Sequence, residues 1–116
     1  CGLFLYQTDR WSEFGVAEIE NEPDEYGFKH IKQIVEKPKE FVSDLAVTGM
    51  YLYTPDVYHY LDELTPSQRG ELEISDINSM YAKTHLTCWC QFDTFWSDLG
   101  TPESMLKVQN YLNNET

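Results

Sequence analysis

One long and nearly apolar run does most to decide the fold: Leu45-Ala46-Val47-Thr48-Gly49-Met50-Tyr51-Leu52-Tyr53. A run of this kind is typical of a strand covered on both faces, and it predicts the centre of a sheet. The pair Thr54-Pro55 follows directly and is typical of a helix N-cap and first helical position. A short amphipathic helix is then predicted by apolar residues at helical spacing, namely Val57, Tyr60, Leu61 and Leu64.

Strands and helices alternate along the rest of the chain. Four further strands are expected, over 1–6, 14–19, 28–36 and 86–92. Two further helices are expected, one marked by Ile74, Ile77 and Tyr81 and one running from Thr101-Pro102 past Leu112. The acidic segment 20–27 predicts a turn that joins two strands into a hairpin. This order predicts an α/β or α+β domain over residues 1–116.

Composition excludes several classes of protein. The 116 residues are 41% hydrophobic and 15% aromatic, which predicts a folded domain. Twenty acidic against eight basic side chains give a net charge of -12, which argues against binding to nucleic acid or to an anionic membrane. No signal peptide or membrane span is indicated, so we expect a soluble, cytoplasmic protein. The chain does not begin with Met, and we expect it to be part of a longer one.

Cysteine and histidine give weak signals. Three cysteines are too few for a disulfide framework. Cys88 and Cys90 would share one face of a strand, and ordinary buried thiols are favoured there over a metal site. The histidines, at positions 30, 59 and 85, lack ligand spacing, and surface or partly buried side chains are favoured over a catalytic base.

Glu36-Lys37-Pro38 is the first segment that could carry chemistry. Proline ends regular strand pairing and leaves the carboxylate and ammonium at the strand end. The carboxylate suits sugar hydroxyls, and the ammonium suits a phosphate. A solvated charge pair is the alternative, and these residues alone favour it.

Two later segments are also charged. Arg69-Gly70-Glu71-Leu72-Glu73-Ile74-Ser75-Asp76 precedes and opens a predicted helix, and its acids alone favour a charged helix N-terminus. Asp98 lies in Trp96-Ser97-Asp98-Leu99-Gly100-Thr101-Pro102, in a turn before the last helix. Its carboxylate could reach Mg²⁺, although Asp before Gly is also common in turns.

The order of these segments resembles the C-terminal half of the sugar-1-phosphate nucleotidyltransferases, most closely the glucose-1-phosphate thymidylyltransferases. The resemblance covers nearly the whole chain, through FGVAEIE, IVEKPKE, LAVTGMYLYTPDV, LTPSQRGELEISDIN and FWSDLGTPESMLKVQNYL. It implies the C-terminal part of a Rossmann-like fold, a mixed sheet with flanking helices. It also implies condensation of a nucleoside triphosphate, with dTTP favoured, and a sugar 1-phosphate, with glucose 1-phosphate favoured, to an NDP-sugar and pyrophosphate.

The resemblance also implies roles for particular residues. Lys37 would hold the sugar phosphate, Glu36 the sugar hydroxyls, and Asp98 one Mg²⁺. Gly15 would let the backbone approach the ligand, and Arg69 would assist phosphate binding or brace the site. The remaining residues implied to line the sugar-phosphate site are Val47, Thr48, Gly49 and Tyr51.

This chain also departs from the family pattern. The family's GxGGxGTR loop and its first metal aspartate do not occur in the 116 residues, so we expect this chain alone to be inactive. Ser97 and Leu99 replace residue types common beside the metal aspartate. A homo-oligomer is expected of the full-length parent. A non-catalytic sugar-phosphate-binding or regulatory subunit and an acidic interaction domain are the alternatives.

Overall fold

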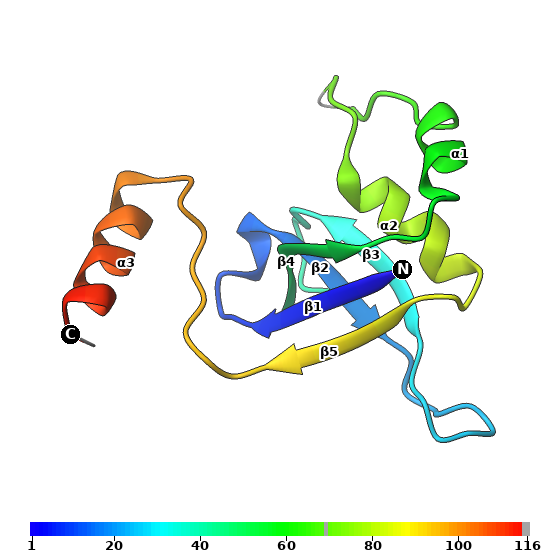
Figure 1. The fold of residues 1–116 in the computed structure, drawn as a ribbon, viewed down its shortest axis with the longest axis horizontal. Coiled ribbons are helices and arrows are strands. Elements are labelled where there is room, and N and C mark those ends of the chain that lie inside the picture. Colours follow the sequence, from blue (N-terminus) through cyan, green and yellow to red (C-terminus); the bar gives the residue numbers. More distant parts are fainter. Residues whose placement is uncertain (69, 115–116) are drawn as a thin grey trace.

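A mixed five-stranded sheet forms the body of the protein, in the order β3-β2-β4-β1-β5 (Figure 1). The computed structural model describes residues 1–68 and 70–114. Its strands are β1 (Gly2–Gln7), β2 (Gly15–Ile19), β3 (Ile31–Glu36), β4 (Leu45–Leu52) and β5 (Cys88–Phe92). Its helices are the 3-10 turn η1 (Trp11–Glu13), α1 (Val57–Asp62), α2 (Ile74–Lys83) and α3 (Pro102–Asn114). The expected mixed sheet with flanking helices is confirmed.

The apolar run 45–52 lies at the centre of the sheet, as its sequence predicts. β4 pairs antiparallel with β1 along its length and meets β2 at Val16↔Ala46. β2 and β3 form the expected antiparallel hairpin. On the other side β1 pairs in parallel with β5.

A bulge interrupts β4 in the middle of this pairing. Leu5 pairs with Val47 and Leu3 pairs with Tyr51, so Phe4 alone stands opposite residues 48–50. Gly49 and Met50 are exposed as a result. The expectation of a strand covered on both faces is therefore wrong for the second half of β4, because the surplus residues leave the ladder.

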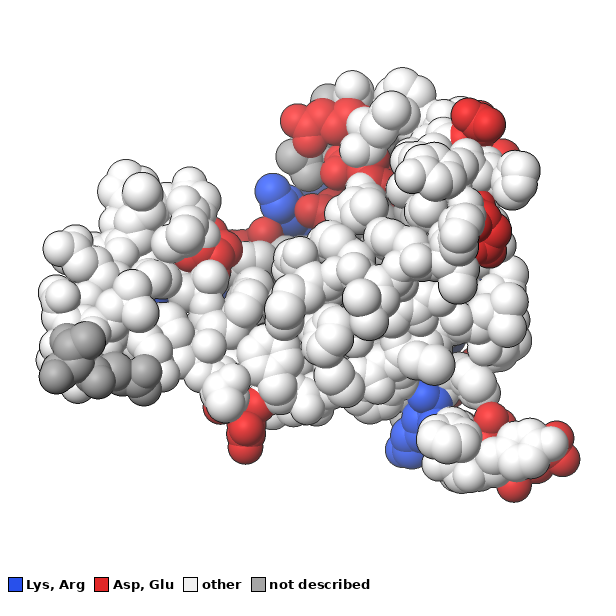
Figure 2. Space-filling model, in the orientation of Figure 1, with Lys and Arg blue, Asp and Glu red and all other residues white. Residues whose placement is uncertain are grey.

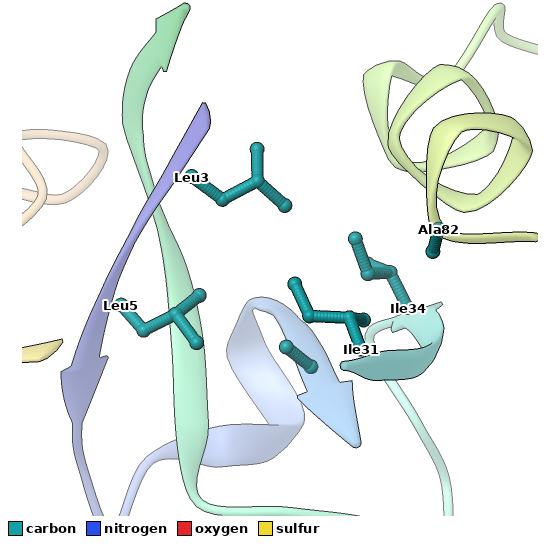
Figure 3. Close-up of a cluster of buried hydrophobic side chains, with 6 residues drawn as sticks. Leu3, Leu5, Ile31, Ile34 and Ala82 are labelled. Carbon is teal, nitrogen blue, oxygen red and sulfur yellow. The ribbon is translucent and has the colours of Figure 1, made fainter. Parts of the chain in front are cut away.

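The hydrophobic core lies between the sheet and α2. Figure 3 shows Leu3 and Leu5 of β1 pointing toward Ile31 and Ile34 of β3, with Ala82 of α2 beyond them. Each of these side chains is at most 7% exposed. Burial of one leucine of this kind contributes roughly 1.5–3 kcal/mol, so these contacts fix α2 against β3.

Turn chemistry explains where several elements begin. The predicted strand 28–36 begins only at Ile31, because the Asp24 carboxylate accepts hydrogen bonds from the N–H groups of Tyr26 and Phe28, both at 2.9 Å. The N–H of Phe28 and then His30 hold the pKa of Asp24 below its usual value. The prediction of Thr54 as an N-cap is wrong, since α1 begins at Val57 and its capping residue is Asp56.

The last helix lies at the opposite side of the molecule from α1 and α2, at the end of an extended segment (Figure 1). Thr101 caps it as predicted, because its Oγ1 accepts a hydrogen bond of 3.1 Å from the N–H of Ser104. The Ser104 hydroxyl in turn accepts from the Thr101 N–H at 3.1 Å. This reciprocal cap fixes the turn that follows Asp98.

The charge is unevenly spread. On the face shown in Figure 2, acidic side chains gather over α1 and the start of α2, and basic ones form small separate areas. Cys88 and Cys90 share a face of β5 as predicted, but they are exposed free thiols and not buried ones, because β5 is an edge strand. Within residues 1–68 and 70–114, no helix is long and apolar enough to cross a membrane.

Candidate functional site

One cavity of about 330 Å³ collects most of the residues predicted to carry chemistry. It lies where the β2–β3 hairpin, β4, the first turns of α2 and the segment before α3 meet. The predicted residues that line it are Gly15, Glu36, Lys37, Val47, Tyr51 and Asp98. The other lining residues were not predicted as site residues, and they are Glu13, Phe14, Ile74, Ser75, Asn78 and Gly100.

The open end of the hairpin places Glu36 and Lys37 at the cavity. Glu36 pairs with Gly15 in the ladder, and the N–H of Lys37 donates to the Phe14 carbonyl at 3.0 Å. Lys37 then has φ +43°, in the left-handed region that a side chain disfavours. This conformation ends the strand, and buried Pro38 continues the chain away from it. β3 therefore ends at the charged pair Glu36-Lys37.

Close packing explains the glycine at position 15. A Cβ there would lie 2.9 Å from both Glu36 Oε2 and Ser75 Oγ, closer than unbonded atoms normally approach. The Ser75 hydroxyl donates to Glu36 Oε2, which ties the start of α2 to the end of β3. Gly15 is needed here because a side chain would separate this pair.

Tyr51 lines the same cavity. Burial raises its pKa, and the negative charge of Glu36 raises it further. Tyr51 therefore stays protonated at neutral pH and keeps a hydrogen-bond donor. Its ring stacks on Tyr53, with centroids 5.9 Å apart, which fixes its direction.

Asp98 has one oxygen engaged and one free. Its Oδ2 accepts a hydrogen bond of 2.9 Å from the N–H of Gly100, which closes the turn predicted from the sequence. Its Oδ1 is buried and, among the residues that the structure describes, has no hydrogen-bond partner. A buried carboxylate oxygen without a donor suits a cation, because leaving it unpaired is costly.

Asp98 also lines a second cavity, of about 190 Å³. Arg10 and Lys107 line that cavity, and Arg10 pairs through two nitrogens with Glu13, at 2.8 and 2.5 Å. The hydrogen bonds with Glu13 raise the pKa of Arg10 above its usual value. Asp98 therefore lies between two cavities, one with Glu36 and Lys37 and one with Arg10 and Lys107.

The larger of these two cavities is lined mainly by acidic charge, as the chain as a whole is acidic. Lys37 is the one cation among the described residues that line it, and Glu13, Glu36 and Asp98 supply the acids. No group of three or more histidine, cysteine or acidic side chains within residues 1–68 and 70–114 is arranged to hold a metal. Asp98 therefore fits a metal as one ligand and does not form a complete metal site.

Three residues implied by the resemblance do not line the cavity or are not described. Thr48 is fully buried, and its hydroxyl donates to the Phe4 carbonyl at 2.9 Å, so it stabilises the bulge. Gly49 is exposed, and an added Cβ would meet nothing within 4 Å. The bulge accounts for both positions. Arg69 lies outside the described residues.

The sequence did contain a signal for two residues that we did not predict. Ser75 and Asn78 lie three residues apart on the buried face of α2, among Ile77, Tyr81 and Ala82. Polar side chains on an otherwise apolar helix face need partners, and here they reach the cavity.

Comparison with known proteins decides the family. The family model described as nucleotidyl transferase matches residues 2–115. The chain belongs to this family. Nucleotidyl transferase relatives include the glucose-1-phosphate thymidylyltransferase of Neisseria meningitidis, which is 39% identical over 95% of this chain and 37% of its own length. The UTP–glucose-1-phosphate uridylyltransferase AglF of Haloferax volcanii is 32% identical over 97% of this chain and 46% of its own length.

A solved nucleotidyl transferase structure has the same fold. A UDP-glucose pyrophosphorylase complexed with UDP-glucose superimposes with a TM-score of 0.84 at 29% identity, over 99% of this chain and 44% of that one. The chain thus spans less than half the length of these relatives. The Rossmann-like fold and the place of this chain among the sugar-1-phosphate nucleotidyltransferases are confirmed.

Proposed function

We propose that the chain is the sugar-1-phosphate-binding part of an enzyme that makes a nucleotide sugar. The supporting observation is the cavity that brings Glu36 and Lys37 together with Asp98 from a separate segment of the chain. The thymidylyltransferase relative favours dTTP and glucose 1-phosphate as substrates. The nucleotide-binding part, and a homo-oligomeric assembly, are proposed for the longer protein.

Each polar group of the cavity suits one part of a sugar phosphate. The Lys37 ammonium is a point charge that binds a phosphate oxygen. The Glu36 carboxylate, oriented by Ser75, accepts hydrogen bonds from sugar hydroxyls. Tyr51 donates a further hydrogen bond, and Gly15 leaves room for the Glu36 carboxylate and the Ser75 hydroxyl beside the backbone. Arg69, by resemblance, assists at the phosphate.

The proposed reaction needs no proton transfer from the protein. A phosphate oxygen of the sugar 1-phosphate, already anionic at neutral pH, attacks the α-phosphorus of the triphosphate in line. The new P–O bond forms as the bond to the β-phosphate oxygen breaks, and pyrophosphate leaves with that electron pair. The residues of this chain accelerate the step by holding the nucleophile in place and by offsetting its charge.

Mg²⁺ is proposed as the cofactor, with Asp98 as one ligand. The Oδ1 of Asp98 is buried and has no hydrogen-bond partner in the described part of the chain, which fits a hard cation that takes oxygen ligands. When bound, Mg²⁺ would reduce the repulsion between the two anionic substrates. The remaining ligands would come from the substrates, from water and from the longer protein.

The complete gene product that contains this chain tests the proposal. With Mg²⁺, dTTP and glucose 1-phosphate, it is expected to release pyrophosphate in step with dTDP-glucose formation, measured by a coupled phosphate assay and by chromatography. Binding of glucose 1-phosphate without turnover with any nucleoside triphosphate would instead support a regulatory subunit. The absence of both binding and turnover with every sugar 1-phosphate tested would reject the proposal.

Gly15→Ala is expected to weaken glucose 1-phosphate binding by at least about tenfold. The added Cβ displaces the Glu36 carboxylate or the Ser75 hydroxyl. Both are ends of side chains that can move, so the free energy of unfolding should change by only about 1 kcal/mol. Gly49→Ala is the control, because it adds a methyl group in open space and should leave binding unchanged. Gly100→Ala would not serve, because Gly100 lines the same cavity. Equal binding by the Gly15 variant and wild type would show that this close packing does not shape the site.

A further inference from the structure

Asn78 is a buried polar residue of the cavity to which neither the sequence nor the resemblance assigns a role. It lies on α2, one turn after Ser75, and is only 1% exposed. It lines the same cavity as Glu36 and Lys37. A carboxamide in this position needs partners for one carbonyl oxygen and two N–H bonds.

The carbonyl end of Asn78 is already occupied by donors. The Tyr53 hydroxyl donates to Asn78 Oδ1 at 2.5 Å, and the Cys1 thiol lies 4.0 Å from the same oxygen. Burial raises the pKa of Tyr53 to about 12, so this hydroxyl remains a donor throughout the neutral range. Tyr53 is held in turn by its ring contacts with Tyr51 and Tyr81. The carboxamide orientation is therefore set by a rigid partner.

The amino end of the same group has no such partner. Among the hydrogen bonds of residues 1–68 and 70–114, none has Asn78 Nδ2 as its donor. Since Tyr53 fixes the carbonyl oxygen, the amino group must lie in the carboxamide plane on the side opposite that oxygen. Asn78 lines the cavity, so an amino group without an acceptor in the described protein is available to a ligand there.

We propose that Asn78 contacts the ligand, and that its Nδ2 donates a hydrogen bond to one hydroxyl oxygen of the sugar. This rests on the proposed function and adds a determinant of sugar selectivity to it. Glu36 only accepts hydrogen bonds, whereas a sugar hydroxyl both donates and accepts. Glu36 and Asn78 together therefore supply the acceptor and the donor that neighbouring hydroxyls on a pyranose ring require. Tyr53 is a positioning residue that acts through Asn78.

The experiment is a coupling measurement on the complete gene product. Isothermal titration calorimetry gives dissociation constants for glucose 1-phosphate and for each of its monodeoxy analogues, with wild type and Asn78→Ala. One deoxy position is expected to weaken wild-type binding about three- to tenfold. Asn78→Ala should weaken glucose 1-phosphate binding by the same factor. The Asn78→Ala variant should then bind that one deoxy analogue as tightly as it binds glucose 1-phosphate. A purely structural role would weaken all analogues alike.

Two further variants make the test independent of folding defects. Tyr53→Phe keeps the ring contacts and removes the orienting hydroxyl. It should weaken glucose 1-phosphate binding by a smaller factor than Asn78→Ala does, and the loss should be confined to the same sugar hydroxyl. Ser79→Ala is the matched control on α2, since Ser79 donates to the Ile34 carbonyl and does not line the cavity, and it should bind as wild type does. If Asn78→Ala does not fold, the deoxy series with Tyr53→Phe decides.

The outcomes separate this inference from the function on which it rests. The role of Asn78 would be overturned if wild type binds glucose 1-phosphate and the Asn78 and Tyr53 variants bind every deoxy analogue equally more weakly. That result would leave the proposed function intact. No wild-type binding of any sugar 1-phosphate would overturn both.

Discussion

Asp98→Ala in the complete gene product is expected to lower kcat/KM for pyrophosphate release by about 10²- to 10³-fold or more. The variant removes a buried carboxylate oxygen that has no partner among the described residues and that we propose as a Mg²⁺ ligand. The loss should be accompanied by a higher Mg²⁺ concentration at half-maximal rate. Steady-state rates measured over a Mg²⁺ titration check both effects.

Asp98→Asn separates the metal role from the turn. Its amide oxygen can still accept the hydrogen bond that the Gly100 N–H donates to Oδ2, so the turn before α3 should be retained. The negative charge is lost, so we expect a fall in kcat/KM similar to that of Asp98→Ala. Wild-type turnover in Asp98→Asn at limiting Mg²⁺ would contradict the assignment of Asp98 to the metal.

Lys37→Met should raise the KM for glucose 1-phosphate about ten- to hundredfold. Hydrogen bonds to charged groups contribute about 1.5–3 kcal/mol, and Lys37 is the one cation among the described residues lining the larger cavity. The KM for the nucleoside triphosphate should change much less. Lys39→Met, on an exposed neighbour that does not line the cavity, is the matched control and should leave both KM values unchanged.

A glycine at position 37 tests the backbone separately from the charge. Lys37→Gly should lose as much sugar-phosphate affinity as Lys37→Met. The free energy of unfolding of the glycine variant should be about 0.5–1 kcal/mol higher than that of the methionine variant. The reason is the φ of +43° at this residue, which glycine adopts without the steric cost of a Cβ. Urea denaturation measures the difference. Lower stability of the glycine variant would mean that the left-handed conformation is not the wild-type one.

The periodicity of the sequence predicted the elements of the fold and the central strand. Local hydrophobic spacing decides such features, so the apolar run 45–52 and the hairpin of β2 and β3 were both predicted. The bulge in β4 was not, because it depends on how many residues of β1 stand opposite Thr48 and Gly49. Pairing register is a property of two strands that lie far apart in the sequence.

The candidate site was predicted more by motif order than by chemistry. Taken alone, Glu36-Lys37 indicated a solvated charge pair and Asp98 a common turn residue. Only the resemblance related these residues to one another. The structure adds the reason for Gly15, which is the close approach to Glu36 and Ser75. The position of Asn78 on an apolar helix face was the available signal, but no pattern in a single sequence shows which end of an amide is occupied.

A crystal structure of the complete gene product with glucose 1-phosphate tests the central claim most directly. We expect the phosphate beside the Lys37 ammonium and the sugar hydroxyls beside the Glu36 carboxylate, in the cavity that Gly15 and Asp98 also line. Sugar phosphate bound elsewhere, with no contact to Lys37 or Glu36, would contradict the account.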